Sequence, residues 1–194
     1  MGKKGEETRA LIREKALLLF AQKGFDSVTM KDICLATGLS RGGLYRHYES
    51  TRQIFSEILE LMLDAQRQEF SEKMRGGIAA RDILSGILER YRNEMLDGSG
   101  ALSLAILEFY RQRRPGGGEN ALYRQYLDSR AMWSDFIAYG VRRGEFRDID
   151  AGEVIDILLF SYQGVRMLSP VLPVGSETPE RIIGHIQRLL LKEE

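Results

Sequence analysis

Apolar residues recur at helical spacing along almost the whole chain, and glycine, proline and short polar runs interrupt them. No segment alternates apolar and polar residues between turn signals, as a half-buried strand would. We therefore expect an all-α protein of about nine helices.

The first fifty residues predict three helices. The first covers 7–23, where Ile12, Ala16 and Phe20 share one face, and it ends before Gly24. A short second helix begins at Thr29 and ends near residue 37. A short third helix follows and runs toward Tyr48.

Capping residues mark where the second, third and fourth helices begin. Thr29 with Asp32 has the spacing of a capping box, and Ser50 with Gln53 repeats that arrangement before a long fourth helix. Ser40 is placed to cap the third helix. The apolar face expected for the fourth helix is Ile54, Ile58, Met62 and Ala65.

Five further helices follow. The stretch 102–110 is apolar nearly all round, which predicts a helix buried in the middle of a bundle, and 154–168 is too apolar to lie on a wet surface. Pro170 and Pro173 end that helix, and Thr178 followed by Pro179 predicts the start of the last one. The expected ranges are 84–95, 102–110, 120–143, 154–168 and 178–190.

Composition limits the class of protein. The chain has 194 residues, of which 43% are hydrophobic, enough for one or two cores. Cys34 is the single cysteine, which excludes an internal disulfide framework and a multi-cysteine zinc site. No stretch approaches the roughly 18 apolar residues of a membrane span, and the first residues lack a signal-peptide pattern. We expect a cytoplasmic protein without metal, cofactor or membrane contact.

Charge is distributed unevenly although the formal net charge is zero. Residues 1–55 hold ten lysines and arginines against six acidic residues, and residues 56–194 hold eighteen against twenty-two. A basic head suits a polyanionic partner, and chance clustering of solvated charges is the alternative. We expect a DNA-binding domain at 1–50 and a ligand-binding and dimerisation domain at 51–194.

Two short helices joined by a turn at Gly38 match the helix-turn-helix unit, whose second helix enters the major groove. In the third helix of the chain, Leu44 and Tyr48 can face the core. Gly42 and Gly43 each cost a helix about 1 kcal/mol relative to alanine, but they let the backbone approach DNA closely.

Arg41 is the best candidate for a bidentate contact to guanine. Thr29, Lys31, Tyr45 and His47 are placed for phosphate contacts. Thr29 and Ser40 alternatively serve only as caps, and His47 alternatively bonds only locally. The complete set of expected DNA-binding residues is Thr29, Lys31, Ser40, Arg41, Gly42, Gly43, Tyr45, Arg46 and His47.

Residues 9–55 resemble the amino-terminal domain of the TetR (tetracycline-repressor-like) family. The matching residues are Ile12, Ala16, Phe20, Gly24, Phe25, Val28, Thr29, Met30, Asp32, Ile33, Ala36, Gly38, Leu39, Ser40, Gly43, Leu44, Tyr45, His47, Tyr48, Ser50 and Ile54. The resemblance implies that Thr29, Ser40, Arg41, Gly42, Tyr45 and His47 touch DNA. The sequence departs from the family pattern at Thr51, where many relatives carry a lysine. The phosphate contact that this lysine usually makes is therefore expected to be missing or to pass to Arg52.

A helix-turn-helix protein that binds as a two-fold dimer needs a dimer surface. The last two predicted helices carry more apolar residues than one small core needs, and family members pair such helices. Alternatively, these faces only cover the helix at 102–110. The expected interface is Ile155, Leu158, Leu159, Tyr162, Ile182, Ile186, Leu189 and Leu190.

The resemblance also implies a small-molecule effector held among the middle helices, and large adaptable side chains there suit an apolar or aromatic compound. The candidates are Met62, Tyr91, Met95, Glu108, Tyr126, Trp133, Tyr162 and Arg166. The aromatic residues alternatively form ordinary core. Glu108 and Arg166 could read ligand charge, pair with each other or face solvent.

The sequence thus predicts a ligand-responsive transcriptional repressor that binds a palindromic operator as a homodimer. An enzyme is disfavoured, because the chain lacks HExxH and GxSxG and its glycine run at 116–118 lacks the ending of a phosphate-binding loop. A regulator of the same fold that answers a protein partner, with no small-molecule ligand, is the remaining alternative.

Overall fold

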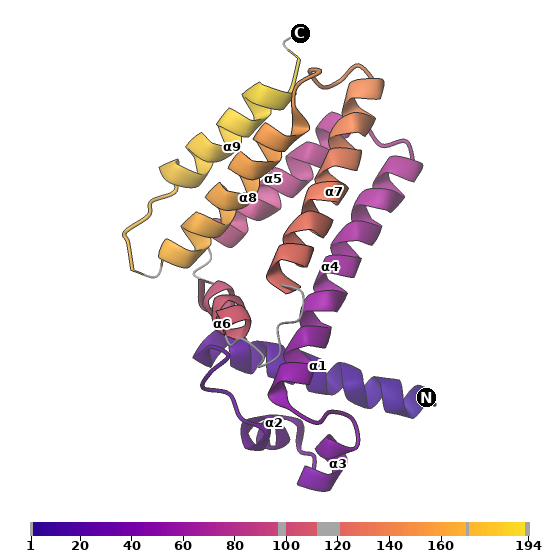
Figure 1. Ribbon diagram of the computed structural model, residues 1–194, viewed down its shortest axis with the longest axis vertical. Coiled ribbons are helices and arrows are strands. Elements are labelled where there is room, and N and C mark those ends of the chain that lie inside the picture. Colours follow the sequence, from indigo (N-terminus) through magenta and orange to yellow (C-terminus); the bar gives the residue numbers. More distant parts are fainter. Residues whose placement is uncertain (1, 97–99, 112–120, 170, 193–194) are drawn as a thin grey trace. The chain divides into compact units, whose positions relative to one another are not determined.

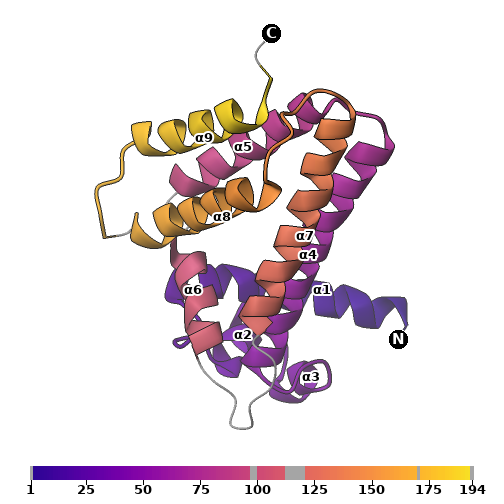
Figure 2. The same cartoon turned by 45° about the horizontal axis from the view of Figure 1, so that its top comes forward.

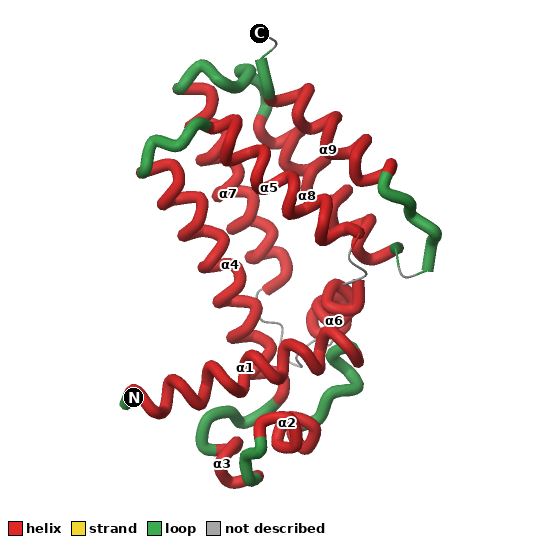
Figure 3. Tube along the Cα trace, turned by 180° about the vertical axis from the view of Figure 1, so that it is seen from behind, coloured by secondary structure: helices red, strands yellow, loops and turns green. Residues whose placement is uncertain are grey.

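A computed structural model describes residues 2–96, 100–111, 121–169 and 171–192. Within these residues every regular element is a helix, as Figure 3 shows, and an isolated bridge joins Phe146 to Leu191. The all-α prediction is confirmed. The helices are α1 (Lys3–Lys23), α2 (Met30–Thr37), α3 (Arg41–Tyr45), α4 (Thr51–Arg75), α5 (Ala80–Leu96), α6 (Gly100–Arg111), α7 (Ala121–Arg142), α8 (Ala151–Leu168) and α9 (Glu177–Leu190).

The chain divides into two compact units. The first unit holds residues 1–64 and 101–114, and the second holds 65–100 and 115–194. These packing units differ from the expected division at residue 50. Residues 51–64 of α4 and residues 101–111 of α6 belong to the same unit as the three amino-terminal helices.

The core of the first unit is built from one face of each of its helices. Ile12 and Phe20 of α1, Leu44 of α3 and Ile54 of α4 are fully buried in one cluster, which Phe109 of α6 joins. The predicted core positions Leu44 and Tyr48 are confirmed, at 0% and 1% exposure. Helices α2 and α3 therefore share one hydrophobic core with α1, α4 and α6.

The second unit is a helical bundle. Helices α5, α8 and α9 lie side by side in Figures 1 and 2, and α7 packs against α5 and α8. Phe70 from the second part of α4 meets Trp133 and Phe136 of α7 edge-on, with ring centroids 5.3 and 5.2 Å apart. These aromatic rings fill the centre of the bundle.

Helix ends follow the expected signals at most positions. Gly38 and Gly144 adopt the positive φ expected of glycines that stop helices, with values of 71° and 73°. The last helix begins before Thr178, with Ser176 as its N-cap residue, so Pro179 lies within the first turn. Pro170 and the glycine run at 116–118 lie outside the described residues.

Two expected faces are confirmed only in part: Ile54 and Ile58 of α4 are buried, whereas Ala65 is exposed. Met62 is 46% exposed, because the buried face of α4 passes through Ile58 and Leu59 and no longer includes residue 62. Helix α6 is not buried all round, since Leu104 and Leu107 are 50% and 41% exposed. In the described part of the chain, no helix is long and apolar enough to cross a bilayer.

Candidate DNA-binding surface

The start of α2 is fixed by a capping box. The Thr29 hydroxyl accepts a hydrogen bond from the Asp32 amide at 3.2 Å, and the Asp32 carboxylate accepts one from the Thr29 amide at 2.9 Å. Hydrogen bonds from the Thr29 hydroxyl and amide lower the pKa of Asp32 to about 2. The predicted cap is confirmed, and a phosphate contact by exposed Thr29 stays a prediction.

Helix α3 is short, and the side opposite buried Leu44 faces solvent. Ser40 caps it, because its hydroxyl accepts a hydrogen bond from the Gly43 amide at 3.1 Å. The helix ends at Tyr45, earlier than expected, and a turn leads to buried Tyr48. Arg41, Tyr45 and Arg46 are exposed on the opposite side, so they are available to an external partner.

The two glycines of α3 have different surroundings. A Cβ on Gly43 would lie 3.3 Å from the Ser40 hydroxyl, so a glycine here serves the cap. A Cβ on Gly42 would meet nothing within 4 Å. The packing of the subunit therefore gives no reason for glycine at position 42, whereas close approach by an outside surface would.

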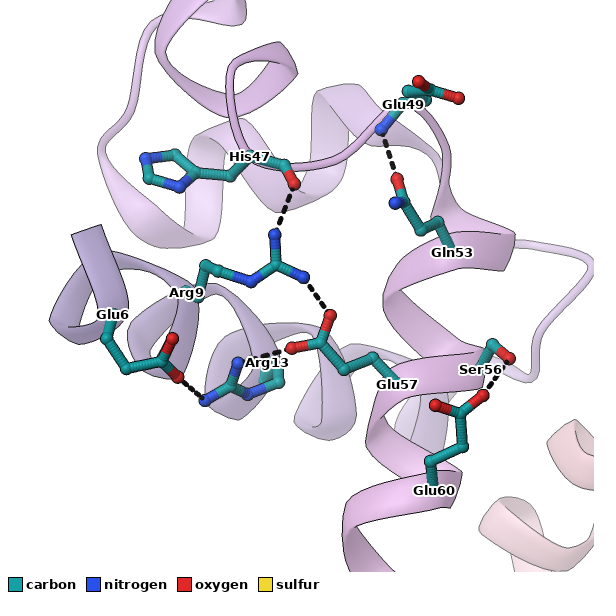
Figure 4. Close-up of polar contacts among 9 residues, drawn as sticks. All are labelled: Glu6, Arg9, Arg13, His47, Glu49, Gln53, Ser56, Glu57 and Glu60. Carbon is teal, nitrogen blue, oxygen red and sulfur yellow. Dashed lines mark hydrogen bonds and ion pairs between the residues drawn. The ribbon is translucent and has the colours of Figure 1, made fainter. Parts of the chain in front are cut away.

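A polar cluster on the inner side of this region was missed by the sequence interpretation (Figure 4). Arg9 of α1 donates to the carbonyl of His47 at 2.9 Å and forms an ion pair with Glu57 of α4. Arg13, one turn later on α1, donates to the other Glu57 oxygen at 2.6 Å and to Glu6 at 2.8 Å. We call Arg9, Arg13 and Glu57 the Glu57 cluster.

Electrostatics within the Glu57 cluster favours its charged form. Burial alone raises the pKa of Glu57, but hydrogen bonds from Arg9 and Arg13 outweigh burial and hold the pKa below its ordinary value. The guanidinium of Arg9 also lies over the Tyr48 ring, 4.2 Å from the ring centroid. Two of the basic residues counted among 1–55, Arg9 and Arg13, therefore form ion pairs within the protein. The available signal was their four-residue spacing, which puts both on one face of α1.

Arg52 is also engaged inside the first unit. Its guanidinium donates to the carbonyl of Phe109 at 3.0 Å and lies 4.5 Å from the centroid of the Phe109 ring. The usual phosphate contact was expected to be missing at Thr51 or to pass to Arg52. Arg52 is bound to α6, and whether it also contacts phosphate stays a prediction.

Glu108 links α6 to the connection between α1 and α2. One carboxylate oxygen, Oε2, accepts hydrogen bonds from the amides of Phe25 at 2.7 Å and Asp26 at 3.1 Å. Phe109 beside it meets the Phe25 and Phe55 rings edge-on at 5.2 Å. Glu108 thus joins α6 to this connection, and it lies in a different unit from most other ligand candidates, so its expected contact with a ligand stays a prediction.

Several predicted ligand-binding residues do come together inside the second unit. Tyr91 stacks on Tyr162, with ring centroids 4.2 Å apart and planes inclined by 22°. The Tyr162 hydroxyl donates to Glu94 and accepts from Arg166 at 2.7 Å. Gln66, like Glu94, was missed by the sequence interpretation, and its amide donates to the Tyr91 hydroxyl at 2.9 Å. We call Gln66, Tyr91, Glu94, Tyr162 and Arg166 the Tyr162 cluster.

The remaining ligand candidates have other surroundings. Met95 and Trp133 are buried in the same core as the Tyr162 cluster. The Tyr126 hydroxyl instead donates to Asp156 at 2.6 Å, and the centroid of its ring lies 6.2 Å from that of Tyr123 and 6.0 Å from that of Phe160. Met62 is an exposed residue of the first unit. Tyr91, Tyr162 and Arg166 are therefore in contact with one another, Tyr126 and Met62 lie apart from them, and a ligand contact by any of these residues stays a prediction.

A separate open groove of about 310 Å³ lies between α5 and α9. Leu88, Arg92, Ile183 and Gln187 are among its lining residues. The groove includes none of the predicted ligand-binding residues.

The expected dimer face was wrong for most of its members. Five of the eight residues are buried within the subunit itself, at 7% exposure or less, so they cannot be the surface that meets a partner. The five are Ile155, Leu158, Tyr162, Ile186 and Leu190. Leu159, Ile182 and Leu189 are partly exposed. The other side of α8 carries exposed Ile157 and Phe160, at 41% and 68%.

Comparison with known proteins places this surface in context. Residues 12–58 match the family model described as bacterial regulatory proteins, tetR family. The chain is 31% identical over 152 residues to the helix-turn-helix-type transcriptional repressor KstR2 of Rhodococcus jostii, covering 77% of this chain and 72% of that protein.

Solved structures share the fold. The reduced form of Escherichia coli NemR superimposes with a TM-score of 0.78 at 17% identity, covering 96% of this chain and 98% of that one. A transcriptional regulator from Saccharomonospora viridis, solved in complex with choline, gives a TM-score of 0.71 at 20% identity, covering 97% and 100%. At these identities the likeness concerns the arrangement of the helices.

Proposed function

The chain belongs to the TetR family of bacterial regulatory proteins, and we propose that it is a ligand-responsive repressor that binds a palindromic operator as a homodimer. Transcription regulation through a helix-turn-helix follows from family membership. The family is one of DNA-binding regulators, and its members include the repressor KstR2.

The outer side of α3 is the observation that supports operator reading most directly. Arg41 lies at the first position of the helix, exposed, and neighbouring Gly42 leaves the backbone open to a close approach. An arginine so placed can meet guanine through two hydrogen bonds. The amides at the capped starts of α2 and α3 suit phosphate oxygens, because helix amino-termini attract anions.

Dimerisation would present two such surfaces to one duplex. We infer that the contact uses the exposed side of α8, where Ile157 and Phe160 lie, together with partly exposed Ile182 and Leu189 of α9. Exposed apolar residues of this kind are enriched in protein interfaces. A two-fold dimer would place its recognition helices about 34–36 Å apart, one turn of DNA.

An effector would act from the second unit. The Tyr162 cluster combines stacked aromatic rings with a buried arginine and a carboxylate, which suits a compound with an aromatic or apolar body and polar groups. Effector binding would repack the second unit, move α4 and change the separation of the recognition helices. The effector must then bind the DNA-free form more tightly than the DNA-bound form.

Selection of bound fragments from random duplex DNA tests this proposal. We expect a palindromic sequence to be enriched and bound by two subunits. Operator affinity should fall steeply with salt concentration, because phosphate contacts release counterions. Failure to enrich any sequence, or an affinity that does not change with salt, would contradict the proposal.

A further inference from the structure

The recognition helix α3 depends on contacts with the rest of the first unit for its stability and orientation. It has five residues, barely more than one turn, and isolated helices of that length are unstable. Buried Leu44 and Tyr48 fix one side of the segment to the core. After the helix, the amide of His47 donates to the Leu44 carbonyl within the segment, whereas the His47 carbonyl accepts a hydrogen bond from Arg9 of α1.

Arg9 of α1 contacts the residues that follow this helix. One guanidinium nitrogen, Nη1, donates to the His47 carbonyl at 2.9 Å, and the face of the group lies over the Tyr48 ring. The other terminal nitrogen, Nη2, pairs with Glu57. We call residues 41–48, which comprise α3 and the turn after it, the recognition segment. The planar guanidinium of Arg9 thereby joins α1, the end of the recognition segment and α4 (Figure 4).

Glu57 is the only member of the Glu57 cluster that comes from α4. Its two oxygens receive Arg9 and Arg13 separately, so the carboxylate sets where both guanidinium groups lie. The side chain of Glu57 is 23% exposed, which limits screening by solvent. Without this carboxylate, the fork of Arg9 loses one of its two fixed ends.

We propose that Glu57 is a positioning residue for DNA reading: through Arg9 it holds the end of the recognition segment and so sets the angle at which α3 meets the duplex. The inference rests on the proposed DNA-binding function. It assigns Glu57 no contact with DNA. It predicts that removal of the Glu57 carboxylate harms discrimination between sequences rather than attraction to phosphate.

The sign of the effect separates positioning from simple electrostatics. Removal of an acidic charge near DNA strengthens binding to every duplex, because repulsion of phosphate decreases. Glu60, one turn later on α4, is an exposed carboxylate whose described hydrogen bond is to Ser56, and it provides the matched control. E60Q should therefore bind all duplexes slightly and equally more tightly.

The experiment compares wild type, E57Q and E60Q for affinity to the selected operator and to an unrelated duplex of equal length. We expect the ratio of the two affinities to fall roughly tenfold in E57Q, equivalent to about 1.4 kcal/mol, and to be unchanged in E60Q. R9K keeps the positive charge but removes the fork, so it should also lower the ratio. Circular dichroism of each variant establishes that it is folded, and R9K provides the comparison if E57Q does not fold.

Hydrogen exchange gives a second readout that needs no DNA. The amides of His47 and Tyr48 donate to the Leu44 carbonyl, and they should exchange faster in E57Q than in E60Q. An E57Q variant that keeps the wild-type affinity ratio overturns the inference. A wild-type protein that selects no duplex overturns the proposed function itself, so the two failures are distinguishable.

Discussion

Gly24 faces the carboxylate of Glu108 so closely that a Cβ at position 24 would lie 2.8 Å from Oε2 of Glu108. The φ angle of Gly24 is 78° and its ψ is 169°, a region that only glycine occupies readily. The end of α1 therefore has a conformation and a proximity to α6 that both require a residue without a side chain.

Glu108→Ala should destabilise the first unit by about 1–3 kcal/mol, because the amides of Phe25 and Asp26 lose their acceptor. Gly24→Ala should cost a similar amount through backbone strain and the contact with Glu108. Urea unfolding of both single variants and the double variant measures the coupling between the two sites. If the two losses of unfolding free energy were strictly additive, the 2.8 Å contact between a Cβ at position 24 and the Glu108 carboxylate would have no energetic consequence.

Arg41→Ala should reduce operator discrimination by about 1–3 kcal/mol and leave the fold intact, because Arg41 is exposed and would contact a base edge. Lys31→Ala is the control. Lys31 is expected to contact phosphate, so its removal should weaken binding to all sequences alike and lower the salt slope by about 1. Competition gel shifts with single-base operator variants distinguish the two patterns. Uniform weakening by Arg41→Ala would argue against base reading.

Phe160→Glu should convert the dimer into monomers and reduce operator affinity, because it places a charge on the exposed side of α8. Ile155→Glu should instead unfold the protein, since Ile155 is fully buried in the subunit core. Ile78→Glu, at a residue 42% exposed outside α8 and α9, should change neither property. Analytical ultracentrifugation gives the oligomeric state. A dimeric Phe160→Glu variant would place the interface elsewhere.

The α2 cap should make stability depend on pH through Asp32. The folded state lowers the pKa of Asp32 to about 2 from an unfolded value of 3.8. Its stabilising contribution is complete above the unfolded value and is lost as pH falls through the folded one. The melting temperature of Asp32→Asn should lie below that of wild type at pH 6, and the difference should narrow from pH 4 to pH 2.5. A constant difference would refute the titration of this group as the cause.

Trp133 offers an intrinsic probe of effector binding, because it is the single tryptophan of the chain and is 1% exposed in the core that holds Tyr91. A compound that releases the protein from operator DNA should change the fluorescence of Trp133 over the same range of compound concentrations that causes release. Tyr162→Phe should weaken binding of that compound, because it removes the hydroxyl between Glu94 and Arg166. A releasing compound that leaves Trp133 unaffected and binds Tyr162→Phe normally would locate the effector site elsewhere.

Local signals in the sequence were sufficient for the small helices of the first unit. The caps at Thr29 and Ser40 and the stop at Gly38 depend on residues within three or four positions, and all are present as expected. Leu44 and Tyr48 follow from one turn of helical spacing. Contacts between residues distant in sequence gave no such signal. Arg9 meets Glu57 across 48 positions, and Phe25 meets Glu108 across 83.

The dimer face could not be identified from periodicity, because α8 is apolar on both sides. Ile155 and Leu158 fill the subunit core, whereas Ile157 and Phe160 are exposed. A helix with two apolar faces satisfies the pattern in either orientation. Only the positions of α5, α7 and α9 decide which face is internal.

The membership of α6 in the first unit has a practical consequence for protein engineering. Phe25 and Phe55 are covered by Phe109, so a fragment ended near residue 64 would leave those rings in water and invite aggregation. A chimaera that joins residues 1–64 to the ligand-binding domain of another regulator should also include residues 101–111. Alternatively, it should replace them with a helix that bears an equivalent carboxylate and phenyl ring.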